Sequence, residues 1–314
     1  MNNYPVVVIF GGGGFIGRYL VRNLTKKNFR CIVPTRNPFS KGYLKTQAPP
    51  GAIEIINFST KNLDQIKNAI NNSDFVINLC GILYESRKQK FNTIHTDLPE
   101  TIANLCAQSD IKKFVHVSAI GANKESKSKY QQSKFFGEEK ALNNFKNTVV
   151  IRPSVVCGSE DNFTNLFSKL SVSPVIPVVN MNYKFQPIFV NDVAKAILKT
   201  IEAKNNEGKI YEIGGEKVIS FGDMVKLILK IIGKKRLIVE MPMALAKIQS
   251  MFLGLLPIPP ILTKDQCLIL SEKENIVSGD YLTLEDLNIK PTDVEKEMEN
   301  WLWRYRSGGE FAKV

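Results

Sequence analysis

The chain has 314 residues, of which 44% are hydrophobic and 23% are charged. This balance is typical of a folded protein and excludes disordered, collagen-like and membrane-bundle sequences. Lys and Arg number 42 and Asp and Glu number 30, so the net charge is +12. An excess of this size favours an anionic partner, which is a phosphorylated cofactor, a nucleic acid or an acidic membrane surface.

The cysteines and histidines exclude several kinds of site. The five cysteines are widely spaced and form no CxxC pair. We therefore expect neither a disulfide framework nor a zinc site. The pattern fits a protein in a reducing compartment. His95 and His116 are too few for a histidine-rich site, so no metal is expected. His116 lies in an apolar run, which predicts a core or strand-edge histidine.

The apolar runs indicate where the protein is located. No signal peptide is visible at the N-terminus. The longest apolar run, residues 251–262, contains three prolines and is too short to span a bilayer. We therefore expect a cytoplasmic protein that is not integral to a membrane.

Apolar runs alternate with helical patterns over the first half of the chain. The predicted strands are residues 6–10, 29–34, 53–58, 75–79, 114–118 and 149–152. The predicted helices between them are residues 15–26, 63–71, 98–109 and 133–143. Such alternation predicts right-handed βαβ units in a doubly wound parallel sheet, with helices on both faces and ligands at the carboxyl ends of the strands.

After residue 152 the pattern loosens into a stretch rich in proline and glycine. Helices are predicted at residues 192–203 and 221–232 and a strand at 209–213, with Asp192 as the N-cap of a helix over 193–203. We therefore expect an α/β protein with two domains, the sheet domain at residues 1–152 and a smaller C-terminal α/β domain at 153–314. A segment near residues 186–213 is expected to pack back on the sheet.

The strongest motif runs from Gly11 to Gly17, between the first predicted strand and helix. Gly11, Gly14 and Gly17 have the GxxGxxG spacing, with Phe15 and Ile16 inside it. Glycine permits the positive φ of a tight turn and lets a pyrophosphate approach the backbone, and the helix N-terminus offers free N–H groups. A purely structural turn is the alternative. The strand–turn–helix context favours an NAD(P)-binding Rossmann domain.

The end of the second predicted strand indicates which dinucleotide is bound. NAD sites usually place a carboxylate there for the ribose 2′-hydroxyl, but this strand ends in VPTR at Arg36. Arg36 can form charge-assisted hydrogen bonds to a 2′-phosphate, and Arg18 can supply a second cation. We therefore expect NADP(H) in preference to NAD(H). The alternative for Arg36 is a solvated arginine at a loop start.

Tyr130 and Lys134 form a YxxxK motif that follows Ser118 at the end of the fifth predicted strand. On a helix, positions i and i+4 share a face, so Lys134 can stabilise a tyrosinate and hold the nicotinamide ribose. Tyr130 would then be a general acid or base for a carbonyl or alcohol, with Ser118 polarising the same oxygen. The alternatives are cofactor contact without catalysis and an ordinary surface pair.

These motifs together resemble the short-chain dehydrogenase/reductase superfamily, in particular its extended and atypical members, which include NAD-dependent epimerases and dehydratases. The segments that carry the resemblance occur in order over nearly the whole chain: FGGGGFIGRYLV, VPTRNP, HVSAIGAN, RPSVVCGSEDNF, FQPIFVNDVAKAI, YEIGGEKVIS and LNIKPTDVEKEMENWLWRYRSGG. The set looks most like the branch of NADPH-binding accessory subunits of mitochondrial NADH:ubiquinone oxidoreductase (complex I) and their bacterial relatives.

The resemblance implies a place for each candidate residue along the dinucleotide. The pyrophosphate and the adenosine phosphate would be held by Gly11, Gly14, Gly17, Arg18 and Arg36. The rest of the cofactor would lie beside Asn57 and Phe58 at the adenine, Cys80 and Gly81 after the fourth strand, Ser118, Tyr130 and Lys134 at the nicotinamide, and Pro153 and Val155 in the same wall. Asn57-Phe58 replaces the acidic residue usual after the third strand. In this branch the cofactor is largely structural.

Two apolar segments of the C-terminal half are compatible with several kinds of partner. Residues 241–262 would line a substrate pocket, touch a partner subunit, rest on a membrane surface or belong to the core. Residues 301–306 mix aromatic and basic side chains, which fits a membrane interface or a docked amphipathic helix.

Two functions follow from these expectations. One is an NADP(H)-binding subunit with a structural or redox-linked role, bound to complex I and peripheral on the inner membrane or its matrix side. The other is a free NADPH-dependent oxidoreductase or epimerase-like enzyme with a Ser–Tyr–Lys site and a hydrophobic substrate, such as one in quinone biosynthesis. Nucleic acid is not an expected partner, because the lysines are dispersed and no nucleic-acid motif is present.

Overall fold

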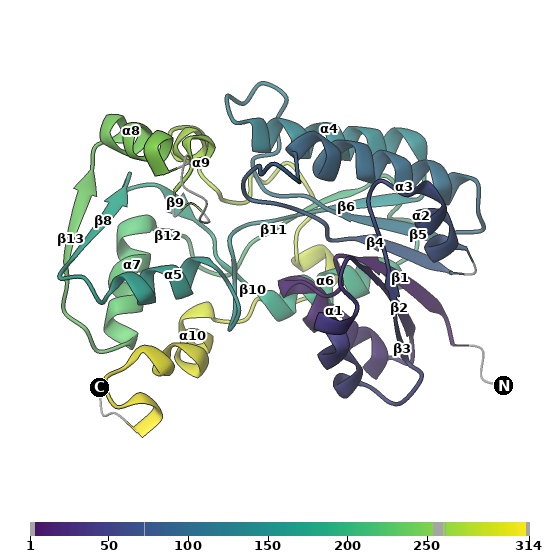
Figure 1. Cartoon of the computed structure of the whole chain (residues 1–314), viewed down its shortest axis with the longest axis horizontal. Coiled ribbons are helices and arrows are strands. Elements are labelled where there is room, and N and C mark those ends of the chain that lie inside the picture. The colour runs from purple at the N-terminus through teal and green to yellow at the C-terminus, as the bar shows by residue number, and fades with distance from the viewer. Residues whose placement is uncertain (1–3, 72, 254–259, 261, 312–314) are drawn as a thin grey trace.

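The computed structural model describes residues 4–71, 73–253, 260 and 262–311. Figure 1 shows two parts side by side, a sheet flanked by helices and a smaller part built of short strands and helices. The first is formed mostly by the N-terminal half of the chain and the second by the C-terminal half. The division at residue 152 stays a prediction.

A seven-stranded sheet forms the centre of the first part. Its strands are short runs rich in β-branched residues, which suits a sheet that is buried on both faces. Every neighbouring pair in it is parallel. In spatial order the strands are β11 (Ile210–Ile213), β6 (Thr148–Pro153), β5 (Lys113–Val117), β4 (Phe75–Asn78), β1 (Val6–Phe10), β2 (Arg30–Thr35) and β3 (Ile53–Asn57). The predicted doubly wound parallel sheet is confirmed, and its order reverses between β1 and β4, where ligands of such sheets bind.

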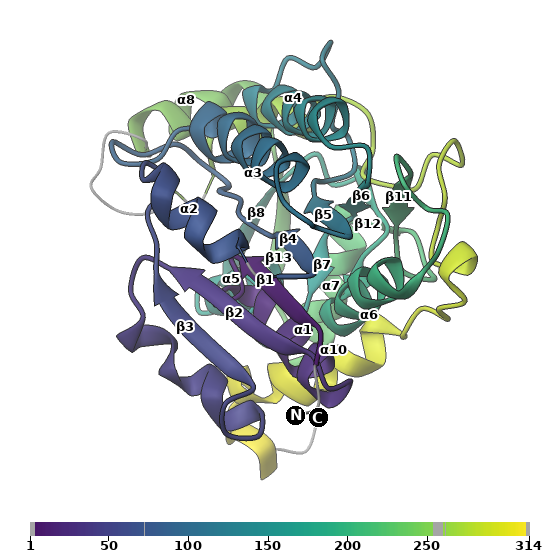
Figure 2. The same ribbon diagram turned by 90° about the vertical axis from the view of Figure 1, so that its right-hand side faces the viewer.

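Helices cover both faces of this sheet, as Figure 2 shows. Alternation along β1 explains the two layers: Val7 and Ile9 pack with Leu20, while Val8 and Phe10 pack with the opposite helices. The helices on the first face are α1 (Phe15–Lys26) and α6 (Val190–Glu202). Those on the second are α2 (Leu63–Ile70), α3 (Leu98–Ala107) and α4 (Lys129–Asn144).

The C-terminal part has a core of its own, in which aromatic rings cluster around Phe221. Its helices are α5 (Phe163–Leu170), α7 (Phe221–Ile231), α8 (Met243–Leu253), α9 (Lys264–Ile269) and α10 (Val294–Leu302). Three pairs of short strands complete it: β8 (Val175–Val179) with β13 (Leu237–Met241), β7 (Val156–Cys157) with β10 (Ile188–Phe189), and β9 (Lys184–Phe185) with β12 (Ile219–Ser220). One long connection of the first part, η1 (Phe39–Gln47), is a 3₁₀ helix, and another, η2 (Asn92–Asp97), is a π-helical turn.

Two helix starts differ from the predictions. The helix predicted over 133–143 begins at Lys129, because Ser128 caps it by accepting a hydrogen bond from the backbone N–H of Gln131. The prediction of Asp192 as an N-cap is wrong. α6 begins three residues earlier, at Val190, with Phe189 at the N-cap. Buried Asp192 accepts hydrogen bonds from the backbone N–H (2.6 Å) and hydroxyl (3.0 Å) of Thr292.

The two apolar C-terminal segments have different outcomes. Trp301 is buried and its indole N–H donates to the Thr164 hydroxyl at 3.2 Å, so residues 301–306 begin in a docked helix. Within residues 241–262, positions 254–259 and 261 lie outside the described residues. Among the helices that the structure describes, none has the length and apolar character needed to cross a membrane.

Candidate functional site

The glycine-rich turn between β1 and α1 is closely packed. Gly11 has φ +80°, and a Cβ added there would lie 3.0 Å from the carbonyl carbon of Leu79. A Cβ added at Gly17 would lie 2.3 Å from the backbone oxygen of Gly12. A side chain at either position would displace the backbone, so these glycines keep the helix start close to the strand end.

The first turn of α1 offers an anion site. Among the described residues no side chain caps this helix at Gly14, and its first turn contains no acidic residue. The N–H groups of a first helical turn have no helical acceptor, and the helix dipole adds partial positive charge there. The turn, which includes Phe15 and Ile16, thus fits the pyrophosphate of a dinucleotide through its backbone.

Arg18 lies beside this turn and forms an ion pair with the C-terminal half of the chain. Its guanidinium donates to the Glu160 carboxylate at 2.9 Å and lies over the Tyr43 ring, 5.1 Å from the centroid. The Tyr19 hydroxyl donates to the same carboxylate at 3.0 Å. The loop after β7 is therefore tied to α1 next to the glycine-rich turn.

The carboxyl ends of β2 and β3 present Arg36 and Asn57. Arg36 is exposed, and none of the described carboxylates forms an ion pair with it. Asn57 is exposed as well, with no negative charge. Phe58 is instead buried against Phe10, with 5.2 Å between the ring centroids. This edge therefore carries a free cation where an NAD site would carry a carboxylate.

Lys134 reaches from α4 to the ends of β4 and β5. Its Nζ donates to the backbone oxygen of Val117 at 3.2 Å and lies 3.4 Å from where a Cβ on Gly81 would be. Burial lowers the pKa of Lys134 to about 8. Burial raises the pKa of the Cys80 thiol to about 12, although the positive charges of Lys134 and Arg36 oppose this. Four predicted site residues thus meet at one edge of the sheet: Arg36, Cys80, Gly81 and Lys134.

Tyr130 lies on α4, as Lys134 does, and its ring packs against two aromatic side chains from outside this helix. Its ring lies edge-on to Phe91 and His95, with centroid distances of 5.8 and 5.3 Å. Burial, and secondarily the negative charge of Asp265, raises the pKa of Tyr130 to about 12. A general base works best with a pKa near the operating pH. At neutral pH Tyr130 is therefore a neutral phenol.

His95, which the sequence analysis did not select, fixes the loop after Gly81 against α4. Its Nε2 accepts a hydrogen bond from the backbone N–H of Ile82 at 3.0 Å, so we assign the ring proton to Nδ1, which donates to the Ser133 hydroxyl at 2.9 Å. Burial, reinforced by Lys134, lowers the pKa of His95 to about 2. The ring is therefore neutral and has a structural role beside the site.

Ser118 lies in front of a buried ion network. Its hydroxyl is buried and has no hydrogen-bond partner of ordinary geometry among the described residues. Burial raises the pKa of nearby Glu138, while Arg152 above all, and Ser118 less, favour its charged form. Arg152 binds Glu138 with two nitrogens (3.0 and 2.6 Å) and Glu212 with a third at 3.3 Å. This network joins α4, β6 and β11 behind the site.

The wall that contains Pro153 and Val155 is held by Asn275. The backbone N–H of Val155 and the Ser154 hydroxyl donate to Asn275 Oδ1 at 3.1 and 2.7 Å. Its Nδ2 donates to the backbone oxygen of Ile120 at 3.2 Å. The C-terminal segment around Asn275 (residues 263–275) therefore packs directly on the loops after β5 and β6.

Asp265 caps the helix that carries the YxxxK motif, and Glu272 holds the loop just before it. Asp265 accepts from the Ser128 hydroxyl (2.7 Å) and from the backbone N–H groups of Lys129 (2.8 Å) and Tyr130 (3.2 Å). Glu272 accepts from the Ser126 hydroxyl and the backbone N–H of Lys127, both at 2.6 Å. No local pattern reveals these contacts, because about 140 residues separate the partners.

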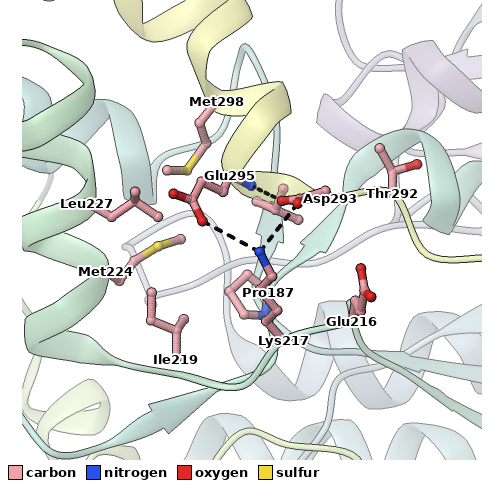
Figure 3. Close-up of a pocket in the computed structure, with 11 residues that line it drawn as sticks. Pro187, Glu216, Lys217, Ile219, Met224, Leu227, Thr292, Asp293, Glu295 and Met298 are labelled. Atoms are coloured by element: carbon pink, nitrogen blue, oxygen red, sulfur yellow. Dashed lines mark hydrogen bonds and ion pairs between the residues drawn. The ribbon is translucent and has the colours of Figure 1, made fainter.

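One cavity, of about 50 Å³, lies elsewhere, between α7 and α10. Apolar side chains such as Met224 and Met298 line it, and Lys217 bridges Asp293 and Glu295 at its rim, as the dashed lines of Figure 3 show. No predicted site residue lines this cavity, and it is too small for a dinucleotide.

Comparisons with known proteins agree with this geometry. The model of the NAD dependent epimerase/dehydratase family matches residues 7–214. The chain is 32% identical to the mitochondrial NADH dehydrogenase (ubiquinone) 1 alpha subcomplex subunit 9 of Dictyostelium discoideum, over 98% of this chain and 87% of that protein. The subunit of the same name from Mus musculus is 29% identical over 96% of this chain and 81% of its own.

A solved structure supports the fold. UDP-glucuronic acid 4-epimerase from Bacillus cereus, in complex with UDP-glucuronic acid and NAD, superimposes with a TM-score of 0.71 at 16% identity, over 95% of this chain and 98% of the other. With the family match covering residues 7–214, the chain belongs to the NAD dependent epimerase/dehydratase family.

Proposed function

We propose that this chain is an NADP(H)-binding accessory subunit of a respiratory NADH:ubiquinone oxidoreductase. The observation that carries the proposal is the similarity, over 98% of the chain, to a protein whose name places it in that complex. A dinucleotide with an additional phosphate is supported by the glycine-rich turn and, within the described residues, by the uncapped start of α1 and the unpaired Arg36.

A structural role for the dinucleotide is supported by the state of the YxxxK residues. Tyr130 is neutral, with a pKa of about 12, and its helix is capped by the Asp265 carboxylate. A redox-linked role would need a group near the nicotinamide that exchanges protons at neutral pH. Lys134, whose pKa is about 8, comes close to this requirement, but its Nζ donates to the backbone oxygen of Val117, so the support for a structural role rests on Tyr130.

The surface of the C-terminal part supports a peripheral location. Leu237, Leu245 and Ile248 are exposed on β13 and α8, and three cations precede β13 at residues 234–236. Apolar and basic groups together fit contact with neighbouring subunits or an anionic membrane surface. We place the chain on the inner-membrane complex, on the matrix side or its bacterial equivalent.

The test is an affinity pull-down of the tagged full-length chain from detergent-solubilised membranes of its own cells. Recovery of other complex I subunits together with bound NADP(H) supports the proposal. If the chain is recovered without those subunits, the partner is wrong. If it oxidises bound NADPH when quinones or ketones are added, a free reductase is the better account.

A further inference from the structure

We infer that Lys41 of η1 is a second cation for the 2′-phosphate of the dinucleotide, acting with Arg36 to select NADP(H) over NAD(H). This inference rests on the proposed dinucleotide binding and assigns a residue that the sequence motifs do not indicate. It follows from where η1 holds the lysine side chain.

The side chain of Lys41 lies across the glycine-rich turn. A Cβ added at Gly13 would be 2.8 Å from Cδ of Lys41, 2.9 Å from Cγ and 3.1 Å from Cε. The aliphatic part of Lys41 therefore occupies the space that any side chain at position 13 would need. The absence of a side chain at Gly13 lets a cation from another element reach the turn.

The position of η1 is fixed by contacts on both sides of Lys41. The Tyr43 hydroxyl donates to the backbone oxygen of Gly13 at 3.1 Å, and Leu44 is fully buried in the core below α1. The backbone N–H of Lys41 donates to the carbonyl of Pro38 at 3.1 Å. These contacts anchor the lysine backbone to the turn, so its placement does not depend on the side chain alone.

The charges at this edge are unbalanced. Within the described part of the chain, Lys41 and Arg36 form no ion pair or hydrogen bond through their charged groups. The neighbouring Arg18 differs, because Glu160 balances it. Two free cations beside an uncapped helix start attract a dianionic phosphate more than a ribose hydroxyl, and β2 ends without the carboxylate that an NAD ribose requires.

The test measures equilibrium affinities of the full-length chain for NADPH and NADH, with Lys41→Met and a control variant, Lys45→Met. Methionine keeps the aliphatic packing on Gly13 and removes the charge, and Lys45 is an exposed lysine of the same 3₁₀ helix. We expect Lys41→Met to weaken NADPH about tenfold, as for one lost charge-assisted contact, and NADH less than twofold. Lys45→Met should change neither affinity.

Two results overturn the inference and differ from each other. Unchanged NADPH affinity, or equal losses for NADPH and NADH, would show that Lys41 does not read the 2′-phosphate, while dinucleotide binding itself stands. If the unaltered chain binds neither dinucleotide, the proposed function fails and the inference fails with it. Adenosine 2′,5′-bisphosphate as a competitor should reproduce the Lys41 effect, whereas 5′-AMP should not.

Discussion

The two ends of the proposed dinucleotide site differ in how their charged groups are paired. At the glycine-rich turn, no side chain that the structure describes pairs with the charged groups of Arg36 and Lys41 or caps the first turn of α1. At the YxxxK helix, Lys134 is buried, Glu138 is bound by Arg152, and Asp265 occupies the helix N-terminus. The first end is open to an external anion, and the second is committed to internal contacts. The difference teaches that only the first end offers unpaired charge to a ligand, as the proposed binding of a phosphorylated dinucleotide requires.

The largest expected effect comes from breaking the committed end. Arg152→Met would leave two buried carboxylates, Glu138 and Glu212, without their common partner. Removing one partner of a buried ion network costs about 3–5 kcal/mol in free energy of unfolding. Chemical denaturation of the variant should show this loss. A change below about 1 kcal/mol would mean that solvent reaches the network.

The open end is tested by filling the glycine turn. Gly17→Ala places a Cβ 2.3 Å from the backbone oxygen of Gly12. The backbone would have to move to relieve this clash. We expect about 3 kcal/mol loss of unfolding free energy, the upper range for overpacking, and loss of dinucleotide binding. Gly42→Ala is the matched control, because no atom of the described residues is found within 4 Å of its added Cβ. Equal behaviour of the two variants would remove the turn from the site.

Acid should lower the free energy of unfolding, because His95 beside the YxxxK helix is neutral in the folded chain. The pKa of His95 is about 2 in the folded chain, so the unfolded chain binds more protons below its ordinary value near 6.5. Stability present above pH 6.5 is therefore lost as the pH falls, by about 2 kcal/mol at pH 5 for this one group. His95→Gln keeps an acceptor for Ile82 and should reduce the loss of unfolding free energy between pH 7 and 5 by that amount. An unchanged loss would show that His95 is not buried neutral.

The smallest expected effect concerns the contribution of Lys134 to NADPH binding. Its pKa of about 8 means that it is mostly charged at pH 7 and mostly neutral at pH 9. Of the groups that influence it, Cys80 titrates near 12, His95 near 2 and His116 near 3, while burial raises the pKa of Glu138, whose carboxylate is bound by Arg152. If the charged form holds the cofactor, NADPH affinity should fall up to about tenfold, or 1.4 kcal/mol, from pH 7 to 9. Fluorescence titration of Lys134→Met should show no such fall.

The sheet and the glycine turn were predictable from sequence because their signals are local. Val6–Phe10 is a buried apolar run, and Gly11, Gly14 and Gly17 after it carry their spacing in the sequence itself. Arg36 could be predicted equally well, because it directly follows the second strand.

The rest of the site depends on contacts between distant segments. Asp265 caps α4 from 136 residues away, and Lys41 reaches Gly13 through a 3₁₀ helix that has no strong periodicity. Asp192 was predicted as a cap by its residue type, yet Thr292, 100 residues later, uses the carboxylate instead. Tertiary contacts of this kind override local preference and leave no trace in the spacing of residues.

The central claim is that the open end selects a phosphate on the adenosine ribose. The most direct measurement is paired equilibrium titration of the full-length chain and of Arg36→Asp with NADPH and NADH. The unaltered chain should bind NADPH at least tenfold more tightly, and the variant should lose most of that preference while keeping its NADH affinity. Equal affinities for the two dinucleotides in the unaltered chain, or equal losses in the variant, would contradict the account.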